Sequence, residues 1–174
     1  MVKELESRDL ALAAVVGSMY VILVALLPVI SFHLVQVRVA DALIPLSSIY
    51  GIPIVVGVSV GCLLANWIAS PWGIYQLTLI DCLLGSLANL IASYTVFLIA
   101  REGGLKRLIG AGLLANLIIT VIVGTYLPYI LKVVTGVDVP LWTSWILIFS
   151  GEFISINILG SLLVVSLKRI HGIR

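Results

Sequence analysis

The chain of 174 residues is 61% hydrophobic and only 10% charged, with a formal net charge of +2. Soluble domains carry about 25% charged residues, so this composition excludes an ordinary water-soluble domain and indicates an integral membrane protein. The small net charge gives no nucleic-acid-binding surface, and the length predicts a single domain over residues 1–174.

Five apolar blocks follow one another along the chain. A helix needs about 20 apolar residues to cross a hydrocarbon core of roughly 30 Å, because each residue rises about 1.5 Å. The blocks cover residues 10–32, 43–70, 74–100, 105–134 and 141–167. The first block has no convincing small-residue cleavage site and several more follow it, so we expect a retained span rather than a signal peptide.

The second block is interrupted by Gly51-Ile52-Pro53. Glycine and proline together mark a turn or a helix break, so the block is expected to form a short pass over 42–50 and a longer one over 53–70. The short pass cannot cross a full bilayer as a straight helix. It must be shielded by protein or lie where the membrane is thin.

Charge placement decides the number of crossings. Lysine and arginine near span ends prefer the cytoplasm. Eight of the ten basic residues form three groups: Lys3 and Arg8; Arg101, Lys106 and Arg107; Lys168, Arg169 and Arg174. If all three groups are cytoplasmic, the chain crosses an even number of times between the first and second, as the split block allows.

The prediction is an all-α polytopic protein of the cell membrane, with six transmembrane helices, a short second helix and both termini cytoplasmic. Five crossings with a weaker charge bias is the alternative.

Small or polar residues recur at every fourth position in three of the blocks, which places them on one face of each helix. These faces are Gly57, Gly61, Ala65 and Ala69; Asp81, Gly85, Asn89 and Ser93; and Gly112, Asn116, Thr120 and Gly124. Close helix packing explains the glycines and alanines. The first block carries the pairs Ala13 with Gly17 and Ala14 with Ser18. Internal packing and a surface for a partner helix both fit that spacing.

Several polar residues predict a pocket that opens to the outside. A carboxylate at membrane depth costs on the order of 3 kcal/mol, so it normally faces a cavity or a partner. By topology six polar residues belong to the outer half of the bundle: Gln36, Arg38, Asp41, Asn66, Asp81 and Glu152. The structural alternative is an ion pair of Arg38 with Asp41 or Asp81, together with a hydrogen-bonded Glu152.

Aromatic residues gather on the same side, at Trp67, Trp72, Tyr75, Trp142 and Trp145. An interfacial belt explains most of them, and one or two could stack on a flat ligand.

Motifs for chemistry are missing from the sequence. There is no Gly-x-x-x-x-Gly-Lys-Ser/Thr loop, no His-Glu-x-x-His and no Gly-x-Ser-x-Gly. Cys62 and Cys82 lie in apolar runs without metal-ligand spacing. We therefore expect no metal, no cofactor, no ATPase of its own and no enzyme activity.

Four segments together resemble the QueT family: Gln36 to Leu43, Gly61 to Asn66, Asp81 with Gly85 to Asn89, and Gly151-Glu152. The family comprises substrate-binding (S) components of energy-coupling factor (ECF) transporters, which are associated with uptake of queuosine precursors. The resemblance extends from about residue 10 to residue 168. The chain departs from the family at Ala40-Asp41, where Ser-Glu is usual, and at Asn89, where threonine is frequent. These departures leave the exact substrate open.

The resemblance implies a six-helix fold with an outward pocket capped by loops. It also implies that Ala13, Ala14, Gly17 and Ser18 dock onto a transmembrane coupling protein, which two cytoplasmic ATPases accompany. The implied ligand is a 7-deazaguanine base, either 7-aminomethyl-7-deazaguanine or its nitrile analogue.

The ligand suggests a role for each polar group. A guanine-like edge offers two adjacent N–H donors that a carboxylate accepts, so Glu152 is the expected acceptor. Asp81 is the substitute for it, or the acceptor for an aminomethyl cation. Arg38, Asn66 or Asn89 would donate to the ring carbonyl. Two alternatives stay open: a solitary or proton-coupled carrier with Glu152 and Asp81 as proton sites, and a membrane enzyme or assembly factor that acts on lipid.

Overall fold

The computed structural model describes residues 6–32, 36–101 and 103–171, and this part of the chain is all-helical, without a β-strand. Five of its helices are long and apolar enough to cross a membrane. They are α1 (Ser7–Leu26), α4 (Ile52–Ala69), α5 (Tyr75–Ala100), α6 (Leu105–Thr135) and a final helix over Leu141–Ile170. The all-α class predicted from composition is confirmed.

Proline divides the first apolar block. Instead of one helix over 10–32, α1 ends at Leu26 and a short helix, α2 (Pro28–Ser31), begins at Pro28. Proline restricts the residue before it to non-helical conformations, and Leu27 accordingly has φ −124° and ψ 46°. The expectation of a single span to residue 32 was therefore six residues too long.

The second apolar block is split where its glycine predicts. A 3₁₀ helix, η1 (Val39–Leu46), continues into α3 (Ser47–Tyr50), and α4 starts after Gly51. Gly51 has φ +71°, a left-handed conformation that glycine adopts without strain, so the chain turns sharply there. The break is confirmed, whereas the count of six crossings and the membrane side of each terminus stay predictions.

The short η1–α3 unit lies inside the protein. Eight residues of 3₁₀ helix at about 2.0 Å each and four of α-helix at about 1.5 Å give a length of about 22 Å, less than the bilayer core. Residues 40–48 are all buried. Contacts to η1 come from α1, α4, α5 and the last helix. Protein therefore shields this unit, as its length requires.

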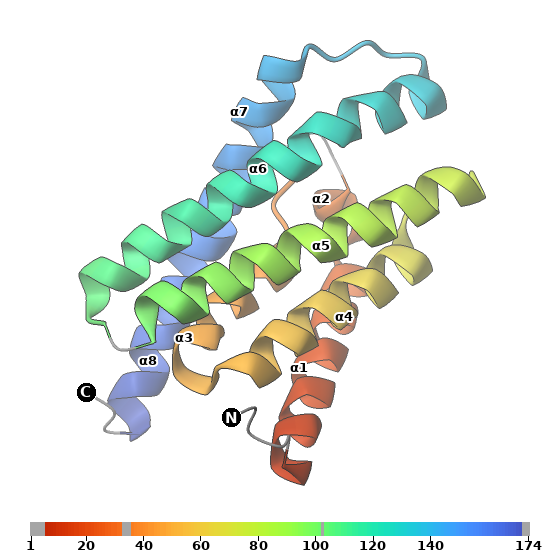
Figure 1. Ribbon diagram of the computed structural model, residues 1–174. Coiled ribbons are helices and arrows are strands. Elements are labelled where there is room, and N and C mark those ends of the chain that lie inside the picture. The colour runs from red at the N-terminus through yellow and green to blue at the C-terminus, as the bar shows by residue number, and fades with distance from the viewer. Residues whose placement is uncertain (1–5, 33–35, 102, 172–174) are drawn as a thin grey trace.

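The long helices pack in chain order, α1 against α4, α4 against α5, and α5 against α6 (Figure 1). Glycines make the first contact close. A Cβ at Gly57 would lie 2.8 Å from the carbonyl oxygen of Ala13, and one at Gly61 would lie 2.9 Å from that of Gly17. The predicted small-residue face of α4 thus packs directly on α1, although its last member, Ala69, is only partly buried.

The last helix closes the bundle. It consists of α7 (Leu141–Glu152), a π-helical segment η2 (Phe153–Gly160) and α8 (Ser161–His171). η2 packs on η1, and a Cβ at Gly160 would lie 2.6 Å from Cγ of Pro45. The last helix also packs on α6. The α6 face that carries small and polar residues is buried, and its Asn116 donates to the carbonyl of Phe149 in α7; the face consists of Gly112, Asn116, Thr120 and Gly124. That face serves helix packing.

The start of α1, the end of α8 and the α5–α6 turn lie at one end of the bundle, and the α4–α5 and α6–α7 connections lie at the other (Figure 1). Described members of the three basic groups lie in these elements: Arg8 in α1, Lys106 and Arg107 at the start of α6, and Lys168 and Arg169 in α8. This arrangement is the one that the charge argument requires.

Candidate functional site

The seven polar residues singled out in the sequence are all buried, none with more than 3% of its surface exposed. They are Gln36, Arg38, Asp41, Asn66, Asp81, Asn89 and Glu152. Arg38, Asp41, Asp81 and Glu152 are the charged residues buried in the described part of the chain. The seven residues come from the connection before η1 and from four helices, η1, α4, α5 and α7. We call these seven residues, together with Tyr20, Cys62, Trp72 and Tyr126, the polar cluster.

Asp41 is fixed by neutral donors. The hydroxyl of Tyr20 donates to its Oδ1 at 2.6 Å, and Nδ2 of Asn89 donates to the same oxygen at 2.9 Å. Asn89 also donates to the Tyr20 hydroxyl oxygen at 2.9 Å. Both amide hydrogens of Asn89 are therefore used within the protein, which explains why an amide is placed at this position.

Both carboxylate oxygens of Asp81 also accept hydrogen bonds from the protein. The indole of Trp72 donates to Oδ2 at 2.8 Å, and the hydroxyl of Tyr126 donates to Oδ1 at 2.6 Å. Nδ2 of Asn66 donates to the backbone carbonyl of Asp81 at 3.0 Å. These bonds join α4, α5, α6 and the 70–74 connection, so Asp81 ties one side of the cluster together.

Arg38 has no carboxylate partner. In the described ranges no acidic oxygen lies within 4.0 Å of its guanidinium nitrogens, so the ion pair with Asp41 or Asp81 is absent. Its Nη1 lies 3.5 Å from Sγ of Cys62, and its Cζ lies 5.5 Å from the centre of the Phe32 ring. Nε and Nη2 have no hydrogen-bond partner.

Glu152 has one oxygen without a partner, Oε2. Gly151 lets the segment before η1 approach α7, because a Cβ there would lie only 2.6 Å from the carbonyl carbon of Gln36 and 3.1 Å from the nitrogen of Val37. The Gln36 side chain in turn donates to the carbonyl of Ser31 at 2.6 Å.

A glycine also lines the middle of the cluster. A Cβ at Gly85 would lie 2.8 Å from Nδ2 of Asn66, 3.4 Å from the Tyr126 hydroxyl and 3.6 Å from Sγ of Cys62. The spacing of α5 suggested helix packing for this glycine, and the side chains that it packs against, from α4 and α6, are members of the polar cluster.

The unpartnered atoms define what the cluster can bind. Arg38 offers the N–H groups of two nitrogens, Nε and Nη2, while Asn66 Oδ1 and Glu152 Oε2 offer acceptors. A buried polar atom without a partner costs about 1–3 kcal/mol, so a guest with both donors and acceptors would be stabilised here. No group of three or more His, Cys, Asp or Glu side chains that could hold a metal occurs in the described residues.

Sequence reasoning did not predict the roles of Tyr20, Tyr126 and Cys62. The signal was present for the two tyrosines, because a buried phenol in an apolar helix usually finds a hydrogen-bond partner. Among the predicted aromatics, Trp72 is buried, whereas Trp67, Tyr75 and Trp142 are exposed, as in an interfacial belt.

The four residues expected to meet a partner line a groove of about 600 Å³ between α1 and α4. Gly17 is in close contact with the backbone of Gly57, while Ala14 and Ser18 are exposed. One row of the small residues therefore packs inside the protein and the other faces outward.

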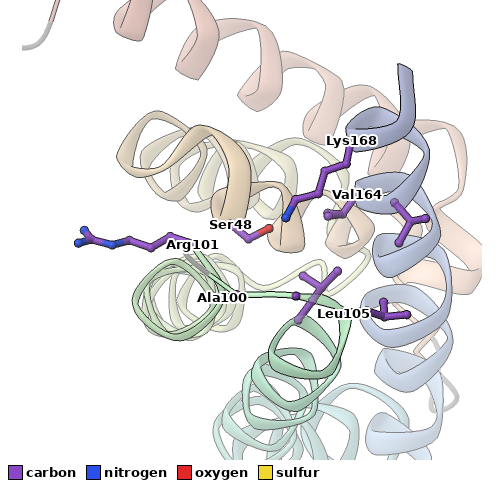
Figure 2. A pocket seen from close by; sticks show the side chains of 10 residues that line it. Ser48, Ala100, Arg101, Leu105, Val164 and Lys168 are labelled. Carbon is purple, nitrogen blue, oxygen red and sulfur yellow. The ribbon is translucent and has the colours of Figure 1, made fainter. Parts of the chain in front are cut away.

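A second pocket, of about 420 Å³, lies at the end of the bundle with the basic groups, between α3, the α5–α6 turn and α8. Lys168 points toward Ser48 and Arg101 points away from the pocket (Figure 2). None of the polar-cluster residues lines it.

The family comparison covers nearly the whole chain. A family model described as QueT transporter matches residues 10–169. No curated protein and no solved structure matches the chain.

Proposed function

Because the chain belongs to the QueT transporter family, we propose that it is the substrate-binding subunit of an ECF-type importer for a queuosine precursor. Membership of this transporter family, together with five long apolar helices in the described residues, identifies the chain as a multi-pass integral membrane protein. The proposal adds the ligand, a 7-deazaguanine base, and the source of energy, which is ATP hydrolysis on partner subunits.

The observation that carries the proposal is the set of unpartnered atoms in the polar cluster. A guanine-like edge carries adjacent N–H donors beside a ring carbonyl. Glu152 Oε2 would accept from that edge, and the free Arg38 N–H groups would donate to the carbonyl. Hydrogen bonds to charged groups are about twice as strong as neutral ones, so this pairing favours a ligand of that pattern.

The hydrogen bonds favour Glu152 over Asp81 as the ligand's acceptor. Both carboxylate oxygens of Asp81 accept from Trp72 and Tyr126. We assign Asp81 to holding those two aromatic side chains. Asn66 Oδ1 is a further open acceptor, since its Nδ2 is bonded to the Asp81 carbonyl.

Substitution of Glu152 tests the ligand assignment. Glu152→Gln keeps the shape and removes the charge, and we expect at least a tenfold weaker affinity for 7-aminomethyl-7-deazaguanine, about 1.4 kcal/mol. Calorimetry on the purified protein in nanodiscs measures it. The matched control is Asp138→Asn, at an exposed carboxylate paired with Lys132. Equal affinity in wild type and Glu152→Gln would remove Glu152 from the site.

The groove between α1 and α4 supports the proposed docking of a coupling protein. Lipid-embedded helices associate through small residues that allow close approach. Replacing Ala14 and Ser18 with leucine fills the groove, and we expect it to abolish co-purification with the coupling protein while ligand binding persists. Ala11→Leu is the control, because Ala11 is exposed on the same helix but does not line the groove.

Reconstitution separates the importer subunit from a solitary carrier. Under the proposal, liposomes that contain only this chain take up no ligand, and uptake requires the coupling protein, both ATPases and ATP. Uptake by the chain alone would favour the carrier.

A further inference from the structure

The guanidinium of Arg38 is held by weak contacts. No carboxylate oxygen of the described residues lies within 4.0 Å of it, and its Nη1 donates to Sγ of Cys62 at 3.5 Å, where a thiol is a weak acceptor. Its Cζ also lies over the ring of Phe32, 5.5 Å from the ring centre. An aromatic face attracts a cation because its π electrons make that face negative. The Phe32 ring therefore helps to set the direction of the side chain, and it leaves Nε and Nη2 without a partner.

Phe32 is in turn packed against Trp72. The two ring centres lie 5.9 Å apart with an angle of 89° between the ring planes. This edge-to-face arrangement is a preferred one for aromatic pairs, because the positive edge of one ring meets the negative face of the other. Phe32 directly follows α2, and Trp72 lies in the connection between α4 and α5. The contact thus joins two separate connections of the bundle, and both side chains are buried.

Trp72 is fixed by Asp81. Its indole Nε1 donates to Oδ2 of Asp81 at 2.8 Å, and the Tyr126 hydroxyl holds the other oxygen of that carboxylate at 2.6 Å. The single N–H of an indole lies in the plane of the ring, so this hydrogen bond restricts the orientation of the whole side chain. A chain of contacts therefore runs from Asp81 through Trp72 and Phe32 to Arg38, and each of its members is buried.

We propose that Trp72 and Phe32 are positioning residues, which hold the Arg38 guanidinium so that its unpartnered N–H groups meet the ring carbonyl of the ligand. The inference rests on the proposed function and adds the residues that determine how strictly the site requires that carbonyl. Position matters because a hydrogen bond weakens steeply as its angle falls below about 120°. A long side chain that is ordered before binding also loses less conformational freedom when the ligand arrives.

Two probes that differ only at the carbonyl test the proposal: 7-aminomethyl-7-deazaguanine and its 6-thio analogue, in which sulfur replaces the carbonyl oxygen. The N–H donors of the ring remain, whereas sulfur is a weak acceptor. Calorimetry on the protein in nanodiscs gives the ratio of the two affinities, which we call the carbonyl preference. We expect wild type to prefer the oxygen by about tenfold, which is about 1.4 kcal/mol.

Replacement of Phe32 by a ring-fluorinated phenylalanine tests the contact with the cation. Fluorine changes the shape of the ring little, but it withdraws electron density from the face over which Arg38 lies. We expect the carbonyl preference to fall about threefold, because the attraction that directs the guanidinium is weakened. The affinity for the 6-thio probe should stay nearly the same, since that probe gains little from Arg38.

Trp72→Phe removes the N–H group that bonds to Asp81 and keeps an aromatic ring. We expect a reduced carbonyl preference here too, and little further reduction when fluorinated phenylalanine is added at position 32, because both changes act through the same contact. Trp67→Phe is the matched control. Trp67 makes a similar edge contact with Tyr75, at 5.7 Å and 85°, but both side chains are exposed and lie outside the polar cluster. This variant should keep the wild-type preference.

The outcomes separate this inference from the proposed function. Equal losses of affinity for both probes, with the carbonyl preference unchanged, would make Phe32 and Trp72 structural residues only and overturn the inference. A wild type that binds both probes equally would also overturn it, while the proposed ligand class stands. If neither probe binds wild type, the proposed ligand is wrong and the inference falls with it. If Trp72→Phe does not fold, the fluorinated protein decides alone.

Discussion

Gly151→Ala places a methyl group where the segment before η1 crosses α7. The added Cβ would collide with the carbonyl oxygen of Gln36 and lie 2.6 Å from its carbonyl carbon. Carbon atoms pack best at about 3.5–4.0 Å, so the two backbones must separate by about 1 Å. Both contacting atoms are backbone, so no side-chain rotation relieves the clash.

The separation moves Arg38 away from Glu152, because Arg38 directly follows Val37 in one of the two contacting segments and Glu152 directly follows Gly151 in the other. Overpacking of this kind costs about 1–3 kcal/mol of stability, against a helix-propensity gain of up to about 1 kcal/mol from glycine to alanine. We expect a lower thermal midpoint and an affinity for 7-aminomethyl-7-deazaguanine reduced at least tenfold, about 1.4 kcal/mol.

Gly110→Ala is the matched control, because a Cβ there meets nothing within 4 Å. Thermal unfolding in detergent and calorimetry in nanodiscs measure both variants. A Gly151→Ala protein that is as stable and binds as tightly as Gly110→Ala would refute the view that this close approach positions the site.

Two further predictions concern the polar cluster. Tyr20→Phe removes the donor to Asp41 and should lower the stability by about 1–3 kcal/mol in thermal unfolding, whereas Tyr129→Phe, at an exposed position, should leave it unchanged; equal midpoints would contradict the role of the Tyr20 hydroxyl. Gly85→Ala displaces the amide of Asn66, so ligand affinity measured by calorimetry should fall more than stability does; unaltered affinity would place the ligand away from α5.

Local sequence signals determined the helices themselves. Apolar blocks of sufficient length must become helices in lipid, since only internal hydrogen bonds satisfy the backbone there. Pro28 interrupts a helix because it restricts the residue before it, and Gly51 does so because it adopts a positive φ without strain; of these two breaks, only the one at Gly51 was predicted. The period-four pattern along α5 placed Asp81, Asn89 and Ser93 on a face that the structure buries.

The burial of the polar residues could be predicted because a charge at membrane depth needs a partner wherever it lies. Which atom partners which could not be predicted. Tyr20 and Asn89 are 69 residues apart and bond through the packing of α1 against α4 and η1, and of α5 beside them. The structural alternative paired Arg38 with Asp41 or Asp81, whereas in the fold Asp81 accepts from Trp72 and Tyr126 and Asp41 accepts from Tyr20 and Asn89.

The amino-acid order thus determined that this chain is a helical membrane protein with buried charges, because hydrophobicity and backbone restrictions act residue by residue. The tertiary structure decided which polar atoms are left unpaired, because hydrogen-bond geometry depends on where distant helices meet. The unpartnered nitrogens of Arg38 and the unpartnered oxygen of Glu152 both follow from that packing.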